Sequence, residues 1–344
     1  MKRIIYLLIA LLLLGSCRMV DPPPEPYEAV IVFEAPTHFP PLEYDLSQNP
    51  VTPEGFRLGK KLFMDGRLSR DGSISCAHCH LSNAAFTQHG HALAHGIDNR
   101  PSMRNVQPIM NLAWNQSFLW DGGIFHLDLF AIAPIETPVE MDESLGNVLV
   151  KLRADAQYRD MFRSAFGKDT IETADFFKAL SQFQLMCVSA GSPYDRHVLG
   201  TQPLTGDALT GLSLFETKCG SCHGGVLQTD HTFRNNGLPV GNPIDTGRER
   251  ITGLGEDQYK FRVPSLRNLR YTFPYMHDGR FETLEEVLEH YNGGVIDSPT
   301  LDDELRSGSQ LGIALSETEK RQLIAFLDAL NDPDFVSNPL TRVF

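Results

Sequence analysis

The sequence predicts an all-α, loop-rich protein built from two copies of one module. The string C-x-x-C-H occurs twice, at residues 76–80 and 219–223. A similar apolar edge precedes each string, at residues 59–63 and 211–215. After each string an asparagine and an Asp-Gly pair recur at the same spacing, which is the pattern of a duplicated unit.

The expected helices open and close each copy. Residues 53–64 have an N-terminal proline and an apolar edge, which is typical of an opening helix. Ser316 begins a capping box, and the helix that follows has an apolar face made by Leu323, Phe326, Leu327 and Leu330. We expect this closing helix to pack on the helix around residues 212–215.

Each C-x-x-C-H string predicts one covalently attached c-type haem. Two C-x-x-C pairs in an exported chain could form disulfides, but the histidine directly after each pair favours haem attachment. Zinc would need further Cys or His at ligand spacing, and none follows. The predicted haem-binding residues are Cys76, Cys79 and His80 in the first copy and Cys219, Cys222 and His223 in the second. The fold class is therefore all-α, with two cytochrome c-like domains that each wrap around one haem.

The N-terminus has the features of an export signal. A basic start precedes an apolar run over residues 4–14, which is too short to span a bilayer. Small residues then lead into Cys17, as in the lipobox of bacterial lipoproteins; the alternative is a signal peptide cut elsewhere, with Cys17 left spare. We expect attachment to the membrane only through a lipid on Cys17, on the periplasmic side. The expected segments are a signal peptide (1–16), a lipid-anchored tether (17–44), an N-terminal domain (45–172) and a C-terminal domain (173–344).

Charge and the remaining cysteine limit the function further. The chain has 30 Lys and Arg against 43 Asp and Glu, a formal net charge of −13. An acidic chain argues against nucleic acid as a partner, and it is compatible with a basic electron donor. Cys187 stands alone in an apolar stretch, so we expect a buried and inert thiol.

Five strings resemble the bacterial di-haem cytochrome c peroxidases. They are LFMDGRLS (62–69), FLWDGG (118–123), PIETPVEM (134–141), VPSLRN (263–268) and PYMHDG (274–279). The resemblance runs from about residue 54 to residue 330. It implies hydrogen peroxide as the substrate, a cytochrome c or cupredoxin as the electron donor, and a homodimer.

The resemblance also implies roles for single residues. Trp120 matches the tryptophan between the two haems, where an indole can relay an electron. Glu140 matches the carboxylate at the peroxide site of the first haem, where it would move a proton between the two peroxide oxygens. Asn105 and the carbonyls of Thr272 and Pro274 match a calcium site of hard oxygen ligands. Without the resemblance, Trp120 is interpreted as a packed core aromatic, Glu140 as a solvated acid and Asn105 as a turn residue.

Two positions near the first haem depart from the family. The family's glutamine beside the peroxide pocket aligns on Phe130, which removes a hydrogen-bond donor and makes the pocket drier. The loop histidine that closes the resting first haem in many members has no counterpart, because the aligned position falls near Ile97. Either His95 takes its place, or the iron is already open and the loop histidines are surface residues.

A third departure concerns the second haem, where the family's methionine matches Tyr291. A tyrosine here resembles the related di-haem enzyme that matures the tryptophan tryptophylquinone cofactor of methylamine dehydrogenase. An anionic oxygen ligand favours oxidised over ferrous iron, which is the opposite bias to methionine. Met276 and His290 are the alternative ligands, and Tyr291 is otherwise a core residue on the apolar helical face of residues 283–291.

Three functions follow from these observations. The leading hypothesis is a reductase of hydrogen peroxide. The second is an oxidase of protein side chains that uses peroxide, which Tyr291 and Phe130 favour. The third is a pure electron-transfer cytochrome, in which both irons are capped by protein on both sides.

Overall fold

The computed structural model describes residues 31–306 and 310–343. The expected signal peptide, Cys17 and residues 17–30 of the tether lie outside these residues. The chain divides into a unit over residues 1–31 and a unit over residues 32–344. Within the described ranges, no helix is long and apolar enough to span a bilayer.

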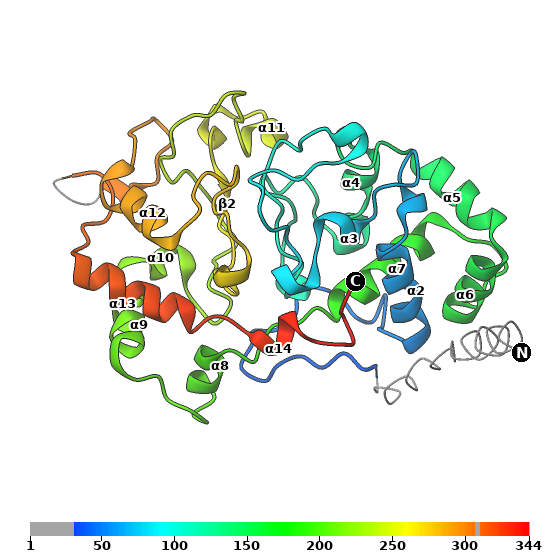
Figure 1. Cartoon of the computed structure of the whole chain (residues 1–344), viewed down its shortest axis with the longest axis horizontal. Coiled ribbons are helices and arrows are strands. Elements are labelled where there is room, and N and C mark those ends of the chain that lie inside the picture. Colours follow the sequence, from blue (N-terminus) through cyan, green and yellow to red (C-terminus); the bar gives the residue numbers. More distant parts are fainter. Residues whose placement is uncertain (1–30, 307–309, 344) are drawn as a thin grey trace, which may run out of the picture. The chain divides into compact units, whose positions relative to one another are not determined.

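The second unit is helix-rich, as expected (Figure 1). Its helices are α2 (Pro53–Phe63), α3 (Cys76–Cys79), α4 (Ile132–Glu136), α5 (Leu145–Ala154), α6 (Ala156–Phe166), α7 (Thr173–Leu185), α8 (Pro193–Val198), α9 (Gly206–Lys218), α10 (Gly220–His223), α11 (Glu249–Thr252), α12 (Leu284–Glu289), α13 (Glu317–Asp328) and α14 (Pro333–Val336). In the described residues, the strands β1 (Phe233–Arg234) and β2 (Phe261–Arg262) form an antiparallel pair. Long irregular segments connect these elements, so loop-rich is a correct description.

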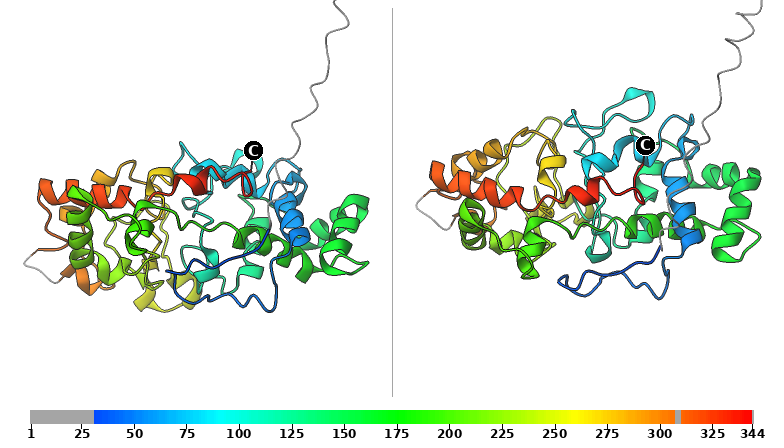
Figure 2. Two further views of the ribbon diagram at one scale, coloured as in Figure 1. Left: turned by 90° about the horizontal axis from the view of Figure 1, so that it is seen from below. Right: turned by 60° about the horizontal axis from the view of Figure 1, so that its bottom comes forward.

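Two helix pairs organise the unit. The opening helix α2 packs against α7, and α9 packs against α13. Both pairs stay side by side in the views of Figures 1 and 2. The expected packing of the closing helix is therefore confirmed, as is its capping box, in which Ser316 and Glu319 satisfy each other's backbone amides.

A glycine lies at the crossing of each pair. A Cβ on Gly59 would lie 1.9 Å from the carbonyl oxygen of Ala179 in α7. In the second pair, a Cβ on Gly211 would lie 1.9 Å from the carbonyl oxygen of Gln322 in α13. Because real side chains do not approach backbone so closely, both crossings require glycine. The two apolar edges noted in the sequence thus share one packing role.

Gly211→Ala is expected to lower the free energy of unfolding by about 1–3 kcal/mol, because the methyl group must push α9 away from α13. Chemical denaturation of the holoprotein measures this change. Gly146→Ala in α5 is the matched control, since a Cβ there meets nothing within 4 Å, and it should be neutral or slightly stabilising. Equal stabilities for the two variants would contradict the proposed role of Gly211.

The backbone repeats with an offset of 157 residues. Asn111 and Asn268 both adopt left-handed geometry, with φ of 55° and 64°. Isolated bridges join Phe118 to Ile124 and Tyr275 to Phe281, which are equivalent pairs. The left-handed pairs Leu119 and Met276, and Gly122 and Gly279, keep the same offset. The predicted internal duplication is therefore confirmed, and it makes His277 the equivalent of Trp120.

The packing also bears on the boundary expected near residue 172. That boundary places α7 in the C-terminal half, whereas α7 packs against α2 of the N-terminal half. By analogy with α9 and α13, α7 is the closing helix of the first copy. We therefore propose that the division between the two copies follows α7; two separate cytochrome c-like domains remain a prediction.

Candidate haem sites and active site

The two C-x-x-C-H strings lie on matching single helical turns, α3 and α10. The four cysteines are free thiols and form no disulfide. The Nδ1 atom of His80 lies 2.6 Å from the carbonyl oxygen of Phe86. The Nδ1 atom of His223 lies 3.1 Å from that of Gln228. Both proximal histidines are therefore held by a carbonyl a few residues along the chain.

These contacts determine which ring nitrogen of each imidazole carries the proton. A carbonyl oxygen only accepts, so Nδ1 carries the proton and the lone pair of Nε2 is free for a metal. Burial lowers the pKa of His80 to about 4, and burial likewise lowers the pKa of His223. Both rings are neutral at pH 7. Free thiols beside a neutral imidazole with an available Nε2 fit a covalently bound haem.

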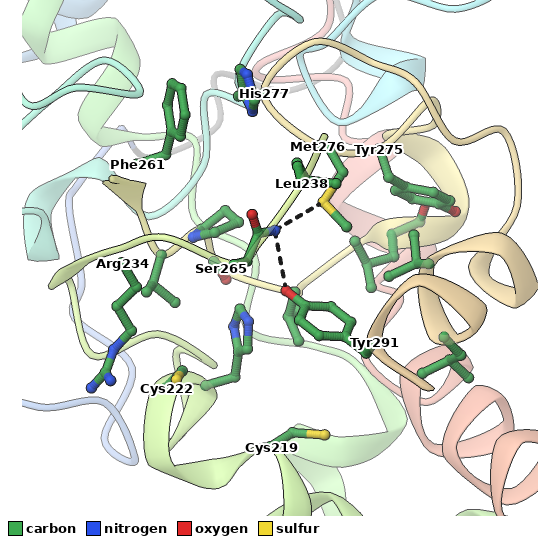
Figure 3. A pocket seen from close by; sticks show the side chains of 18 of the residues that line it. Cys219, Cys222, Arg234, Leu238, Phe261, Ser265, Tyr275, Met276, His277 and Tyr291 are labelled. Carbon is green, nitrogen blue, oxygen red and sulfur yellow. Dashed lines mark hydrogen bonds between the residues drawn. The ribbon is translucent and has the colours of Figure 1, made fainter. Parts of the chain in front are cut away.

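A large cavity adjoins the second string. Its volume is about 240 Å³, which is far more than the roughly 10–15 Å³ that one water needs. Cys219, Cys222 and His223 line it, and so do Met276 and Tyr291 (Figure 3). A cavity of this size, with attachment residues on one side and an oxygen and a sulfur atom on another, is suited to a large ring.

Asn236 links the two candidate ligands of the second iron. Its amide Nδ2 donates to the Tyr291 hydroxyl at 3.5 Å and to the Met276 sulfur at 3.6 Å, both long contacts (dashed lines in Figure 3). Burial raises the pKa of Tyr291 to about 12. His290 instead turns its Nε2 to the carbonyl of Asn236, at 3.0 Å, and does not line the cavity. Tyr291 and Met276 are thus better placed than His290.

Tyr291 lies just beyond the regular α-helical part of its segment. The predicted helix over residues 283–291 ends at Glu289, and a wider π-type turn covers His290–Gly294. Such turns occur often at functional sites. The apolar face expected from the sequence is nevertheless present, because Leu284, Val287, Leu288 and Tyr291 all line the cavity.

Trp120 lies at the edge of the same cavity. Its indole Nε1 donates to the carbonyl of Asn105 at 2.9 Å, and the amide of Asn105 donates to the carbonyl of His277 at 2.8 Å. Thr272 and Pro274 line the cavity as well. The three residues assigned to calcium therefore line one cavity, and the Asn105 side-chain amide nitrogen donates to the carbonyl of Ala92 at 2.9 Å. Their joint role as calcium ligands stays a prediction.

Glu140 lies near the first haem string. Burial, and secondarily the Glu140 carboxylate, raises the pKa of Cys79 to about 12. Burial also raises the pKa of Glu140 itself. The Ile97 amide donates to the Glu140 carbonyl at 2.9 Å, and a Cβ on Gly96 would lie 2.4 Å from that carbonyl oxygen. Glycine at position 96 therefore lets the histidine-bearing loop reach Glu140.

The other two residues predicted near the first haem contact aromatic neighbours. The His95 ring lies 5.4 Å from the ring of His91. The half-buried Phe130 ring lies 5.4 Å from Phe118, two residues before Trp120. No contact places His95 opposite His80, so its role as a ligand stays a prediction.

Sequence reasoning did not identify Asn236 or Arg262. Asn236 contacts two candidate ligands that are 40 and 55 residues away, and an isolated asparagine carries no pattern. Arg262 precedes the string VPSLRN and is 7% exposed. The one sequence feature that sets it apart is that this charged residue stands between the apolar residues Phe261 and Val263.

Comparisons with known proteins agree with this geometry. A family model described as di-haem cytochrome c peroxidase matches residues 53–203. The methylamine utilization protein MauG of Methylorubrum extorquens is 40% identical over 296 residues, which cover 85% of this chain and 82% of MauG. Cytochrome c551 peroxidase of Nitrosomonas europaea is 33% identical over 303 residues, covering 83% and 84%.

Solved structures give the same result for the fold. A MauG-like protein associated with microbial copper homeostasis superposes with a TM-score of 0.79 and 33% identity, covering 90% of this chain and 98% of that one. The di-haem peroxidase BthA of Burkholderia thailandensis superposes with a TM-score of 0.73. At 20% identity the second likeness concerns the fold alone.

Proposed function

This chain belongs to the di-haem cytochrome c peroxidase family, and we propose that it reduces hydrogen peroxide to two waters with two electrons and two protons. The electrons come from a small redox protein, a cytochrome c or a cupredoxin. The observation that carries the proposal is the asymmetry of the two C-x-x-C-H sites. A buried carboxyl, Glu140, lies by the first, whereas the potential ligands Tyr291 and Met276 lie by the second.

Two c-type haems would be held by Cys76, Cys79 and His80 and by Cys219, Cys222 and His223. When bound, their irons supply a redox-active site for peroxide and a store of electrons. The chain contributes two neutral imidazoles whose orientation is set by the carbonyls of Phe86 and Gln228. Both histidines are half-buried, and desolvation lowers the pKa of each ring.

Glu140 would transfer the proton. Among the described residues its carboxyl has no hydrogen-bond or ion-pair partner, and burial raises its pKa. A carboxyl in this state can take a proton from one peroxide oxygen and return it to the other. Phe130, in place of a hydrogen-bonding residue, would leave Glu140 as the main polar group for this step.

Trp120 would relay electrons between the two halves. Its indole is fixed by the carbonyl of Asn105, and its own carbonyl accepts a hydrogen bond from the Arg262 amide at 2.7 Å. Both contacts hold the ring at the edge of the cavity that contains His223. A relay needs such a fixed orientation because its distance to each site must not vary.

A second candidate function is the oxidation of protein side chains with peroxide. Tyr291 favours it, because a phenolate oxygen stabilises oxidised iron more than a methionine does. Similarity to MauG also supports it, and Phe130 is compatible with it.

Spectra of the purified holoprotein test these functions. We expect two covalent haems by mass and electron paramagnetic resonance, a change in one haem on peroxide addition, and peroxide consumption driven by reduced cytochrome c. Consumption that proceeds only with a protein substrate would favour the side-chain oxidase. If neither peroxide nor cyanide perturbs either haem, the protein is an electron-transfer cytochrome and the proposal is wrong.

Tyr291→Phe should change the resonance spectrum of the second haem and leave the first unchanged, because the phenol oxygen would be its ligand. Met276→Leu is the matched control, since Asn236 contacts both side chains. A low-spin His/Met spectrum in the wild type that Met276→Leu abolishes would assign the ligand to Met276 instead.

Three further features belong to the proposal. Asn105 with the carbonyls of Thr272 and Pro274 would bind one calcium ion, with waters completing the six to eight oxygens that calcium takes. The protein would face the periplasm and be anchored through a lipid on Cys17. It would form a homodimer, as the family resemblance implies.

A further inference from the structure

Arg262 is a buried cation without a carboxylate partner in the described residues. Its side chain is part of β2 and the whole residue is 7% exposed. The guanidinium Nε donates only to the backbone carbonyl of Leu119, at 3.5 Å, which is the long limit for a hydrogen bond. No carboxylate of the described chain pairs with it, and burial alone lowers its pKa, to about 10.

Three other arginines in the same region are paired with carboxylates. Arg234 pairs with Asp230 and Asp302, and Arg104 with Asp121 and Asp245. Arg267 is fully buried and pairs with Asp195. Arg262 differs from these three, and it also differs from Arg248, whose guanidinium donates to two backbone carbonyls at 2.8 and 3.1 Å and packs on the Phe233 ring.

An unpaired buried guanidinium is costly, and it remains charged at pH 7 even with its pKa at about 10. Its charge therefore calls for an anion that is not part of the described polypeptide. The planar guanidinium is shaped to bind a carboxylate through two parallel hydrogen bonds. The missing partner is best matched by a carboxylate.

Arg262 also lies where a haem carboxylate could be reached. It is one of the residues that line the cavity of Cys219, Cys222 and His223. Its backbone amide donates to the carbonyl of Trp120 at 2.7 Å, so it is fixed to the residue proposed to connect the two halves. A c-type haem carries two propionate carboxylates.

We propose that Arg262 is a carboxylate-binding residue of the haem sites, whose guanidinium pairs with a haem propionate beside Trp120. This inference rests on the haem attachment in the proposed function and is independent of peroxide reduction. The propionate belongs either to the haem of His223, whose cavity Arg262 lines, or to the haem of His80. The pair would hold one edge of that haem at Trp120.

The test is the reduction potential of each haem in the Arg262→Gln holoprotein, resolved by a redox titration followed by electron paramagnetic resonance. Loss of a cation beside a haem destabilises the reduced, more negative state. We therefore expect a shift to lower potential at the haem whose propionate is bound, and the haem that shifts identifies the source. Arg250→Gln removes the same charge from an exposed position on α11 and should shift neither potential.

Unchanged potentials of both haems in a folded Arg262→Gln protein would overturn the proposal. If that variant does not fold, the Arg262→Lys variant is the deciding test, because lysine keeps the positive charge. Recovery of a folded protein with two haems supports the ion pair, and failure of the lysine variant as well would assign Arg262 to packing and overturn it. A wild-type protein whose mass lacks covalent haem would instead refute the proposed function, so the two failures are distinguishable.

Discussion

Glu140→Gln is expected to reduce the rate of peroxide reduction by a factor of about 10²–10⁴ while both haems stay in place, because general acid–base catalysis typically contributes that much. Glutamine keeps the size of the side chain but cannot transfer the proton. Steady-state turnover with reduced cytochrome c measures the rate, and the visible spectrum measures haem content. Glu136→Gln in α4, an exposed carboxylate nearby, should leave turnover unchanged.

The pH dependence gives Glu140 a second signature. Burial raises its pKa above the usual 4.5. A base that must be ionised is lost as the pH falls through its pKa, so the acid limb of the wild-type rate profile should lie above 4.5 and be absent in Glu140→Gln. Wild-type turnover in the glutamine variant, with the acid limb intact, would remove Glu140 from the mechanism.

Arg267→Gln should lower the free energy of unfolding by up to about 3–5 kcal/mol, because it removes the guanidinium from a buried carboxylate, which keeps only its contacts to His38 and Ser192. Arg267 donates two parallel hydrogen bonds to Asp195, at 2.8 and 2.6 Å, and both residues are fully buried. It also donates to the carbonyl of Val226, three residues after His223, at 2.7 Å. Denaturant titration of the holoprotein measures the loss.

The exposed pair of Arg321 and Asp207, at 3.3 Å, is the matched control. Arg321→Gln should change stability by at most about 1 kcal/mol, because solvent screens an exposed pair. Similar losses of stability in Arg267→Gln and Arg321→Gln would show that burial does not make the Arg267–Asp195 pair more important for stability than an exposed pair.

Acid should weaken the Arg267 pair in a defined range. Although burial opposes ionisation, Arg267 holds the pKa of Asp195 at about 2, below the usual 3.8. A carboxylate with a lowered folded-state pKa stabilises the fold above its unfolded-state pKa, and this contribution is lost as the pH falls from about 4 to about 2. In the Arg267→Gln variant, the free energy of unfolding should therefore fall by less over this pH range than it does in the wild type.

Several features could be predicted because their causes are local in the chain. The C-x-x-C-H strings place two thiols and an imidazole on one turn, so no distant residue is needed to form the attachment site. The start of α13 follows from Ser316 and Glu319, whose side chains each accept a hydrogen bond from the other's backbone amide three residues away. The repeated spacing after each string predicted a duplicated backbone, and Asn111 and Asn268 do share left-handed geometry.

The boundary between the two copies stays a prediction, because helix propensity does not specify which helix packs against which. Residues 173–185 form α7, but nothing local in the sequence says that α7 packs against α2. That follows from Gly59, which lets α2 approach the backbone of Ala179. Gly59 and Ala179 are more than a hundred residues apart in the sequence. Whether they come into contact depends on the tertiary fold, which no short sequence pattern encodes.

By itself, the sequence predicted where haem is attached, and it determined that the module is repeated and which family the chain resembles, since each of these features is carried by short contiguous strings. The tertiary structure decided what surrounds those strings. It joined Asn236 to both Tyr291 and Met276, excluded His290 from the cavity and buried Arg262 without a carboxylate partner among the residues that the structure describes. The physical reason is that the burial of a side chain and its hydrogen-bond partners are set by tertiary packing. A charged residue or a ligand residue acquires its environment only when segments distant in the sequence come together.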